Sequence, residues 1–250
     1  MTVAIGVVLG LAVVTGLLVG TLGGGGSVLT IPILTYVAGM EAKPAIATSL
    51  LVVALTSSAG AINHARAGRV QWRTALVFGG GGVLGAVGGG RVAEHIPGDI
   101  LLILFAVVMA VSAIAMLRGR SALVTPAASA HPHVKLALQG VAVGAVTGLV
   151  GAGGGFMIVP ALVLLARLPM NVAVGTSLVI IAGNSFAGLA GHHGHVDIPW
   201  RLALAIAGCA ITGSVAGSHL AGRVKPEQLR LGFGCFVLAV AAFILIQQLA

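Results

Sequence analysis

Acidic side chains are scarce in this 250-residue chain, which carries 5 Asp and Glu residues against 13 Lys and Arg residues. All of them fall in predicted loops or at the ends of apolar segments: Glu41, Glu94, Asp99, Asp197 and Glu227. Proton relays and cation sites in membrane proteins usually rest on a carboxylate inside the membrane. The sequence therefore argues against a cation pump and against acid–base catalysis, and we expect neither an enzyme nor a bound cofactor.

Charge of either sign is scarce as well, because 7% of the residues are charged and 58% are hydrophobic. Soluble domains carry about 25% charged residues, so the composition predicts an all-α, polytopic integral membrane protein. The net charge of +8 then reflects loop residues that set membrane orientation, and we expect no nucleic-acid partner. The 2 cysteines, Cys209 and Cys235, lie in apolar runs without a disulfide or CxxC pattern.

The sequence repeats itself. Residues 16–93 align with residues 144–221 at a constant offset of 128 and without a gap. Internal repeats are typical of secondary transporters, whose substrate site lies between the halves. The matches include residue types that this composition does not favour: the glycine run before Pro32 recurs before Pro160, Thr48-Ser49-Leu50 recurs as Thr176-Ser177-Leu178, His64 as His192, and Trp72-Arg73 as Trp200-Arg201.

The apolar segments predict how each repeat is built. We expect a first transmembrane repeat at 1–118, a cytoplasmic linker at 119–134 and a second transmembrane repeat at 135–250. Two segments, Ser27–Ala38 and Phe156–Ala166, are shorter than the roughly 17 residues that a spanning helix needs. Each follows a glycine run, so each repeat is predicted to hold a Gly-linked broken or re-entrant helix pair plus three spanning helices.

The distribution of basic residues supports this topology. If each glycine-linked pair makes no net crossing, only Lys43, Arg91 and Arg201 lie on the outer side. Three crossings per repeat make the two repeats inverted, with both termini outside. Ten full crossings give the same division of charge, so the depth of the hairpins stays open. The basic residues assigned to the cytoplasmic side are Arg66, Arg69, Arg73, Arg118, Arg120, Lys135, Arg167, Arg223, Lys225 and Arg230.

A substrate site is predicted where the two glycine runs meet near the midplane. Glycine lets backbone N–H groups converge on an anion, and the helices that follow add their positive dipole ends. Glycines that serve only close helix packing are the alternative, and the repeated glycine–proline–TSL spacing favours the site. The predicted substrate-binding residues are Gly23, Gly25, Gly26, Ser27, Thr48, Ser49, Gly151, Gly153, Gly154, Gly155, Thr176, Ser177 and Asn184.

The histidines have several readings. His192 lies in a His-His-Gly-His stretch that ends at Asp197, and histidine and aspartate are zinc ligands. Only His192 has a histidine partner in the repeat, His64, so we expect no metal site. The two histidines are candidates for gating, because histidine titrates near neutral pH, or for anchoring at the membrane interface beside the tryptophans.

Other glycines have a spacing typical of close helix contact. Gly81, Gly85 and Gly89 lie four residues apart, and so do Gly213 and Gly217. Such small-residue rows let two helices approach each other in a membrane. We expect them to pack helices and assign them no part in a site.

These motifs resemble those of the TauE/SafE family of sulfite and organosulfonate exporters. The residues that carry the resemblance are the G-x-x-G-x-G-G-G-F-x-x-V-P-x-L stretch at Gly148–Leu162, the A-V-G-T-S-L block at Ala173–Leu178 and G-H-V-D at Gly194–Asp197. The first half carries a looser copy, and the resemblance covers nearly the whole chain. This chain departs from the common pattern at Ala152 and Pro199.

The resemblance implies export of small sulfur-containing oxyanions (sulfite, sulfoacetate or related organosulfonates) across the bacterial inner membrane. The expected partners are a small anionic substrate and the lipid bilayer, while the sequence leaves a homo-oligomer open. Import of a sulfur anion, or transport of another small solute, is the alternative. A membrane enzyme or an accessory subunit fits less well, because the chain shows no catalytic grouping and little soluble loop.

Overall fold

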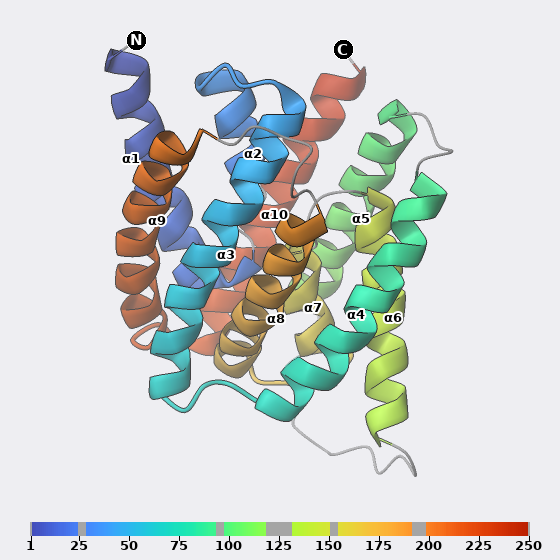
Figure 1. Cartoon of the computed structure of the whole chain (residues 1–250). Helices are drawn as coiled ribbons and strands as arrows, with labels where there is room; N and C mark the ends of the chain where they lie inside the picture. The colour runs from blue at the N-terminus through green and yellow to red at the C-terminus, as the bar shows by residue number, and fades with distance from the viewer. Residues whose placement is uncertain are drawn as a thin grey trace.

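The computed structural model describes residues 2–24, 29–93, 98–118, 132–150, 155–191 and 199–249. Within these ranges the regular structure is helical and no strand occurs, as the sequence predicts (Figure 1). The first half holds α1 (Thr2–Leu22), α2 (Thr30–Pro32), η2 (Ile33–Val37), α3 (Ala42–Arg66), α4 (Trp72–Ala93) and α5 (Gly98–Arg118). The second half holds α6 (Pro132–Val150), α7 (Gly155–Leu164), α8 (Met170–Gly191), α9 (Trp200–Ala221) and α10 (Pro226–Leu249).

The short segment of the first half is less regular than the sequence predicts. Instead of one helix over Ser27–Ala38, the described residues form one α-turn, α2, followed by the π-helical η2. Pro32 has no N–H to donate to the helical ladder, and the next turn widens, so that the Ala38 N–H donates to the Ile33 carbonyl oxygen at 3.0 Å. A widened turn also ends the second copy, where the Ala166 N–H donates to the Ala161 oxygen at 3.2 Å after Pro160.

The linker is shorter than predicted. The sequence places it at 119–134, but α6 already begins at Pro132, so residues 132–134 are helical. Proline is favoured in the first turn of a helix, because its missing N–H would have no intrahelical partner there. With this start α6 is 19 residues long.

The two halves make the same local contacts at equivalent positions. The Ala45 N–H donates to the Glu41 oxygen at 2.9 Å, and its counterpart, the Ala173 N–H, donates to the Pro169 oxygen at 2.8 Å. Gly39 has φ +67°, and the residue that lies 128 positions later, Arg167, has φ +54°. The repeat in the sequence is therefore also a repeat in backbone structure.

Helices of one half pack against helices of the other. α1 packs along α9 and α6 packs along α4, while α3 packs along α8 and α5 along α10. At the offset of 128, α1 corresponds to α6 and α4 to α9, so the pair α1–α9 is equivalent to the pair α6–α4. The two halves are thus interleaved. The N-terminal end of α1 and the C-terminal end of α10 lie at the same end of the molecule (Figure 1).

Glycines hold the interleaved pairs close together, as their spacing predicts. A Cβ on Gly213 of α9 would overlap the Val13 oxygen of α1, and a Cβ on the equivalent Gly85 of α4 would overlap the Val141 oxygen of α6. Gly16 against Ala210 corresponds in the same way to Gly144 against Gly82. These glycines serve backbone-to-backbone packing.

The pair α3–α8 lies at the centre of the molecule. Buried residues of α3 contribute to three apolar clusters through Val52, Val53 and Ala61. α8 contributes Val174 and Leu178 to one of them and Ile181 to another. Among the described residues, four segments are long and apolar enough to cross a membrane: Pro44–Arg66, Met170–Ala187, Trp200–Ala221 and Pro226–Phe243. The two central spans carry both TSL motifs.

Candidate functional site

The two glycine runs meet where the structure describes them. Gly23 adopts φ +76°, and a Cβ there would lie 2.7 Å from the Ser177 Oγ and 2.8 Å from the Val159 Cγ2. A Cβ on Gly24 would overlap the carbonyl oxygen of Gly155, at the start of α7. The end of α1 and the start of α7 are therefore in backbone contact beside the second TSL motif. Glycine is needed at these positions for space, and at Gly23 also for its backbone angle.

Several predicted residues lie outside the described part of the chain: Gly25, Gly26, Ser27, Gly151, Gly153, Gly154 and His192. The others can be placed. Gly23 and Gly155 lie at the junction of the glycine runs, with Ser177 directly against Gly23. Asn184 lies on α8 eight residues beyond Thr176, about 12 Å further along the helix axis. It is partly exposed and stands apart from the glycine junction.

The hydroxyl of Thr176 binds the turn between α3 and α4, which belongs to the other half of the chain. Thr176 is 0% exposed, and its Oγ1 accepts a hydrogen bond from the Gln71 N–H at 3.0 Å. The neighbouring Gly175 packs against the same connection, because a Cβ there would overlap the Arg69 oxygen. Ser177 instead donates to the Val174 oxygen of its own helix at 2.8 Å. The second TSL motif thus joins the glycine junction to the turn between α3 and α4.

The hydroxyl of Thr48 is bonded differently from that of Thr176. Thr48 is 0% exposed and Ser49 is also buried, yet the Thr48 Oγ1 has no hydrogen-bond partner in the described part of the chain. A buried hydroxyl without a partner costs about 1–3 kcal/mol. Such a cost in a central helix marks a position where a ligand or a water molecule can supply the missing bond.

His64 is buried, which excludes the anchoring role that the sequence left open for it. Its side chain is 1% exposed, and its Nε2 lies 3.1 Å from the Gly20 carbonyl oxygen of α1. The Nδ1 has no partner among the described residues. Trp72, which begins α4, and its counterpart Trp200, which begins α9 in the other half, are both 57% exposed, as expected for aromatic side chains at a membrane interface.

One polar residue near the site was missed from the sequence. Ser214 of α9 donates a hydrogen bond to the Thr56 carbonyl oxygen at 3.1 Å, and a Cβ on Gly60 would lie 2.8 Å from its Oγ. The repeat holds a clue to its role, because the equivalent position in α4 is Ala86. The sequence could have indicated Ser214, because its hydroxyl stands beside a row of closely packed glycines in one repeat and is missing from the other.

Buried polar atoms without a partner are concentrated in the first half. In the described part of the chain they belong to α2 and α3: Thr30 Oγ1, Thr48 Oγ1, Thr56 Oγ1, Ser57 Oγ, Asn63 Nδ2 and His64 Nδ1. The described residues show no group of three His, Cys, Asp or Glu side chains that could hold a metal ion. The unpartnered groups at the centre are therefore hydroxyl, amide and imidazole groups, which can donate hydrogen bonds to a ligand.

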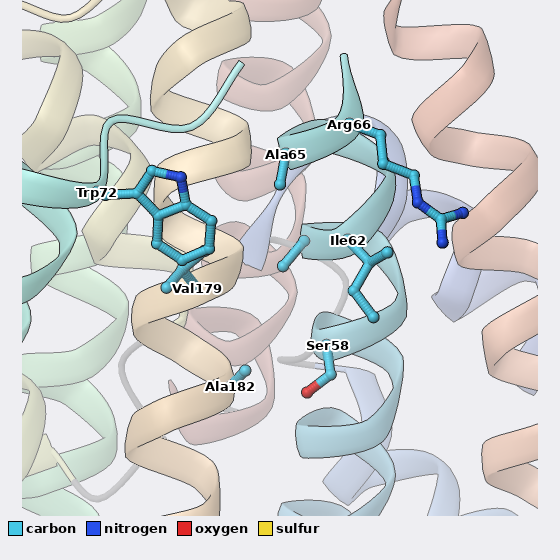
Figure 2. A pocket seen from close by; sticks show the side chains of 8 residues that line it. Ser58, Ile62, Ala65, Arg66, Trp72, Val179 and Ala182 are labelled. Carbon is cyan, nitrogen blue, oxygen red and sulfur yellow. The ribbon is translucent and has the colours of Figure 1, made fainter. Parts of the chain in front are cut away.

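A groove of about 430 Å³ opens between α3, α8 and the start of α4 (Figure 2). Its polar groups are poorly suited to an anion, because the Ser58 hydroxyl already donates to the Ala54 oxygen at 2.7 Å. Figure 2 shows the Arg66 side chain directed away from Trp72. The groove is therefore mostly apolar and is not part of the candidate site. It is lined by Ser58, Ala61, Ile62, Ala65, Arg66, Trp72, Val179 and Ala182.

Comparison with known proteins assigns the family. The family model for Sulfite exporter TauE/SafE matches residues 8–244. A probable membrane transporter protein of Xylella fastidiosa (strain Temecula1 / ATCC 700964) is 36% identical over 247 residues, which cover 96% of this chain and 94% of that protein. The probable membrane transporter protein YdhB of Bacillus subtilis (strain 168) is 30% identical over 188 residues, 73% of this chain and 77% of that protein. No solved structure matches. The chain belongs to the TauE/SafE sulfite exporter family and is a membrane transporter.

Proposed function

We propose that this transporter exports a small sulfur oxyanion, such as sulfite, sulfoacetate or a related sulfonate, through a site between its two halves. The observation that carries the proposal is the contact of Gly24 with Gly155 beside buried hydroxyls. α7 begins at Gly155, and the first four N–H groups of a helix have no partner inside that helix. These donors and the positive end of the helix dipole favour an anion.

The binding groups in this proposal are neutral. The anion contacts backbone N–H groups of the glycine runs and the hydroxyls of Thr48, Ser49 and Thr176. Ser177 lies beside them but donates its proton to the Val174 oxygen, and Asn184 lies further along the path. Without a fixed cation such a site holds its ligand weakly enough to release it, as transport requires. His64, whose Nδ1 has no partner among the described residues, lies next to Gly20 of α1.

The proposed topology follows from the repeat. We infer two inverted repeats in the bacterial inner membrane, each with a glycine-linked pair that makes no net crossing and three spans, and both termini outside. The equivalent hydrogen bonds of the two halves support a pseudo-symmetric arrangement. The interleaved pairs α1–α9 and α6–α4 support a site between the halves.

The membrane potential is sufficient to drive export in this proposal. A monoanion that leaves a negative interior gains about 2.3 kcal/mol per 100 mV. No ion partner is then needed, which agrees with a carboxylate such as Glu41, which precedes α3 and lies outside the span Pro44–Arg66. Import of a sulfur anion, or transport of another small solute, is the alternative and would require a different driving force.

Flux measurements in reconstituted vesicles test the proposal. Sulfite, sulfoacetate, taurine, sulfate and chloride are compared under an imposed potential, with and without a proton gradient. We expect flux of a sulfur oxyanion that follows the potential and does not depend on the proton gradient. Flux of chloride or of an uncharged solute in place of the sulfur anions would contradict the substrate class, and flux that needs the proton gradient would contradict potential-driven export.

A further inference from the structure

The two halves can be compared residue by residue at the positions that directly precede α4 and α9. Gln71 precedes α4 and Pro199 precedes α9, at the offset of 128. Both cap the helix in the same way, since the Ala75 N–H donates to the Gln71 oxygen at 3.0 Å and the Ala203 N–H donates to the Pro199 oxygen at 2.9 Å. The two positions are therefore structurally equivalent, and differences between them are differences in side chain and N–H group.

The first difference is a hydrogen bond. The Gln71 N–H donates to the Thr176 Oγ1 at 3.0 Å. In the other half the corresponding bond would join residue 199 to Thr48, but proline has no N–H. In agreement, the Thr48 Oγ1 has no partner in the described part of the chain. Within the described residues, the bond between a TSL hydroxyl and the residue that precedes α4 or α9 is found in one half, between Thr176 and Gln71.

The second difference concerns how closely the turn between α3 and α4 can approach α8. The Arg69 carbonyl oxygen packs where a Cβ of residue 175 would lie, so glycine at 175 is required for this approach. The equivalent of Gly175 in the first half is Ala47, which carries the Cβ that this approach excludes. Two independent contacts thus hold the turn between α3 and α4 against α8: the packing at Gly175 and the hydrogen bond to Thr176. The residues that both contacts require are missing from the sequence of the other half.

The turn that is held in this way is compact. It comprises residues 67–71, with Gly68 at φ +69° and the Arg69 N–H donating to the His64 oxygen at 2.9 Å. The Arg69 guanidinium reaches α9, where its Nη1 would lie 2.9 Å from a Cβ on Gly222. The turn therefore covers α8 next to Thr176 and contacts the end of α9, and it carries a positive charge.

We propose that the turn 67–71 is a substrate-linked gate of the transport path, closed by the hydrogen bond from Gln71 to Thr176 and by the contact with Gly175. The proposal rests on the proposed anion site. A hydroxyl accepts with its lone pairs and donates one proton, so Thr176 can accept from Gln71 while it donates to an anion at the glycine junction. Hydrogen bonds in such a chain strengthen one another, and a bound anion therefore favours the closed gate.

The opposite half lacks both residues on which this closure depends, since the positions equivalent to Gly175 and Gln71 are Ala47 and Pro199. There, Ala47 and Pro199 prevent the same closure, and the Thr48 hydroxyl stays available to the ligand. In this proposal the transporter is asymmetric: Thr176 contacts the ligand and also couples it to the gate, whereas Thr48 contacts the ligand alone. The gate lies on the side that the basic residues Arg66, Arg69 and Arg73 predict to be cytoplasmic, where an exported anion enters.

Hydrogen–deuterium exchange of the full-length protein in nanodiscs tests the gate directly. The exchange of the segment that contains Gln71 is followed in wild type and in Thr176→Val, Thr176→Ser, Gly175→Ala and Thr48→Val. We expect exchange about five-fold faster in Thr176→Val and Gly175→Ala, the change that the loss of one ordinary hydrogen bond gives. Thr176→Ser keeps the hydroxyl and should behave as wild type, and so should Thr48→Val, the matched control at the equivalent position.

Sulfite, as the probe, tests the coupling in the same experiment. It should slow exchange of the segment in wild type and in Thr176→Ser but not in Thr176→Val. Unchanged exchange in Thr176→Val without sulfite would overturn the gate, and so would an equal increase in Thr48→Val. If sulfite affects no segment of any variant while Thr176→Val still exchanges faster, the gate stands, and the proposed anion site and its coupling to the gate fail.

Discussion

At the scale of single residues, Thr48 and Thr176 have the same sequence context and the same complete burial but different bonding. Replacing a hydroxyl by a methyl group of the same shape removes a donor and an acceptor without changing volume. Where the hydroxyl has no partner, this replacement relieves a buried polar group. Where it has a partner, the replacement leaves that partner unsatisfied. The pair therefore allows function and stability to be measured separately.

We predict that Thr48→Val abolishes flux while thermal stability in detergent stays at or slightly above the wild-type value. Thr176→Val should also impair flux but destabilise the protein by about 1–3 kcal/mol, because the Gln71 N–H loses its acceptor. Thermal unfolding and vesicle flux of the two variants are the measurements. Wild-type flux in Thr48→Val would show that its hydroxyl does not act on the substrate.

Gly23 offers a second residue-level prediction. Gly23→Ala meets both a φ of +76° and a Cβ position 2.7 Å from the Ser177 Oγ, while Gly39→Ala meets a φ of +67° but open space. A left-handed φ costs an L-residue about 1–2 kcal/mol. We expect Gly39→Ala to lose that amount and keep its flux, and Gly23→Ala to lose more stability as well as flux. Equal stability and flux in the two variants would show that the contact with Ser177 is unimportant.

At the scale of helices, the contacts between α1 and α9 and between α4 and α6 are equivalent, and we call these two contacts seams. Each seam depends on glycines that leave room for a backbone oxygen of the partner helix. Gly213→Ala and Gly85→Ala should each destabilise the protein by about 1–3 kcal/mol through overpacking. Gly208 lies on α9 with open space around its Cβ position, so Gly208→Ala is the control and should be neutral or stabilising by up to about 1 kcal/mol. Unfolding temperatures of the three variants give the comparison; a tolerated alanine at 213 or 85 would contradict the close seam.

The helices also show what the sequence could predict. The apolar runs gave ten helical segments, and the glycine spacing gave the seams, because both depend on local composition. The burial of His64 could not be predicted, since it depends on packing against α1 and α8. The bond from Gln71 to Thr176 joins residues that are 105 positions apart. Only the comparison of Gln71 with Pro199 hinted that the two halves differ there.

At the scale of the whole molecule, the repeat and the basic residues together constrain how the chain lies in the membrane. The ends of α1 and α10 lie at one end of the molecule (Figure 1), which requires an even number of crossings. An odd number of crossings in each half places the linker on the opposite side and inverts the second half relative to the first. An even number in each half would place both termini and the linker on one side and would leave the repeats parallel.

Reporter fusions distinguish these arrangements. Alkaline phosphatase, which is active only outside the cytoplasm, should be active when fused after Ala250 and inactive when inserted within residues 119–131, and a fluorescent protein should give the reverse pattern. Activity of the phosphatase at both places would contradict inversion, because it puts the linker on the side of the C-terminus. An exchange of the two results would keep the repeats inverted but reverse the orientation. The turn 67–71, with Arg69, would then face outward, and the proposed gate would control release of the anion instead of its entry.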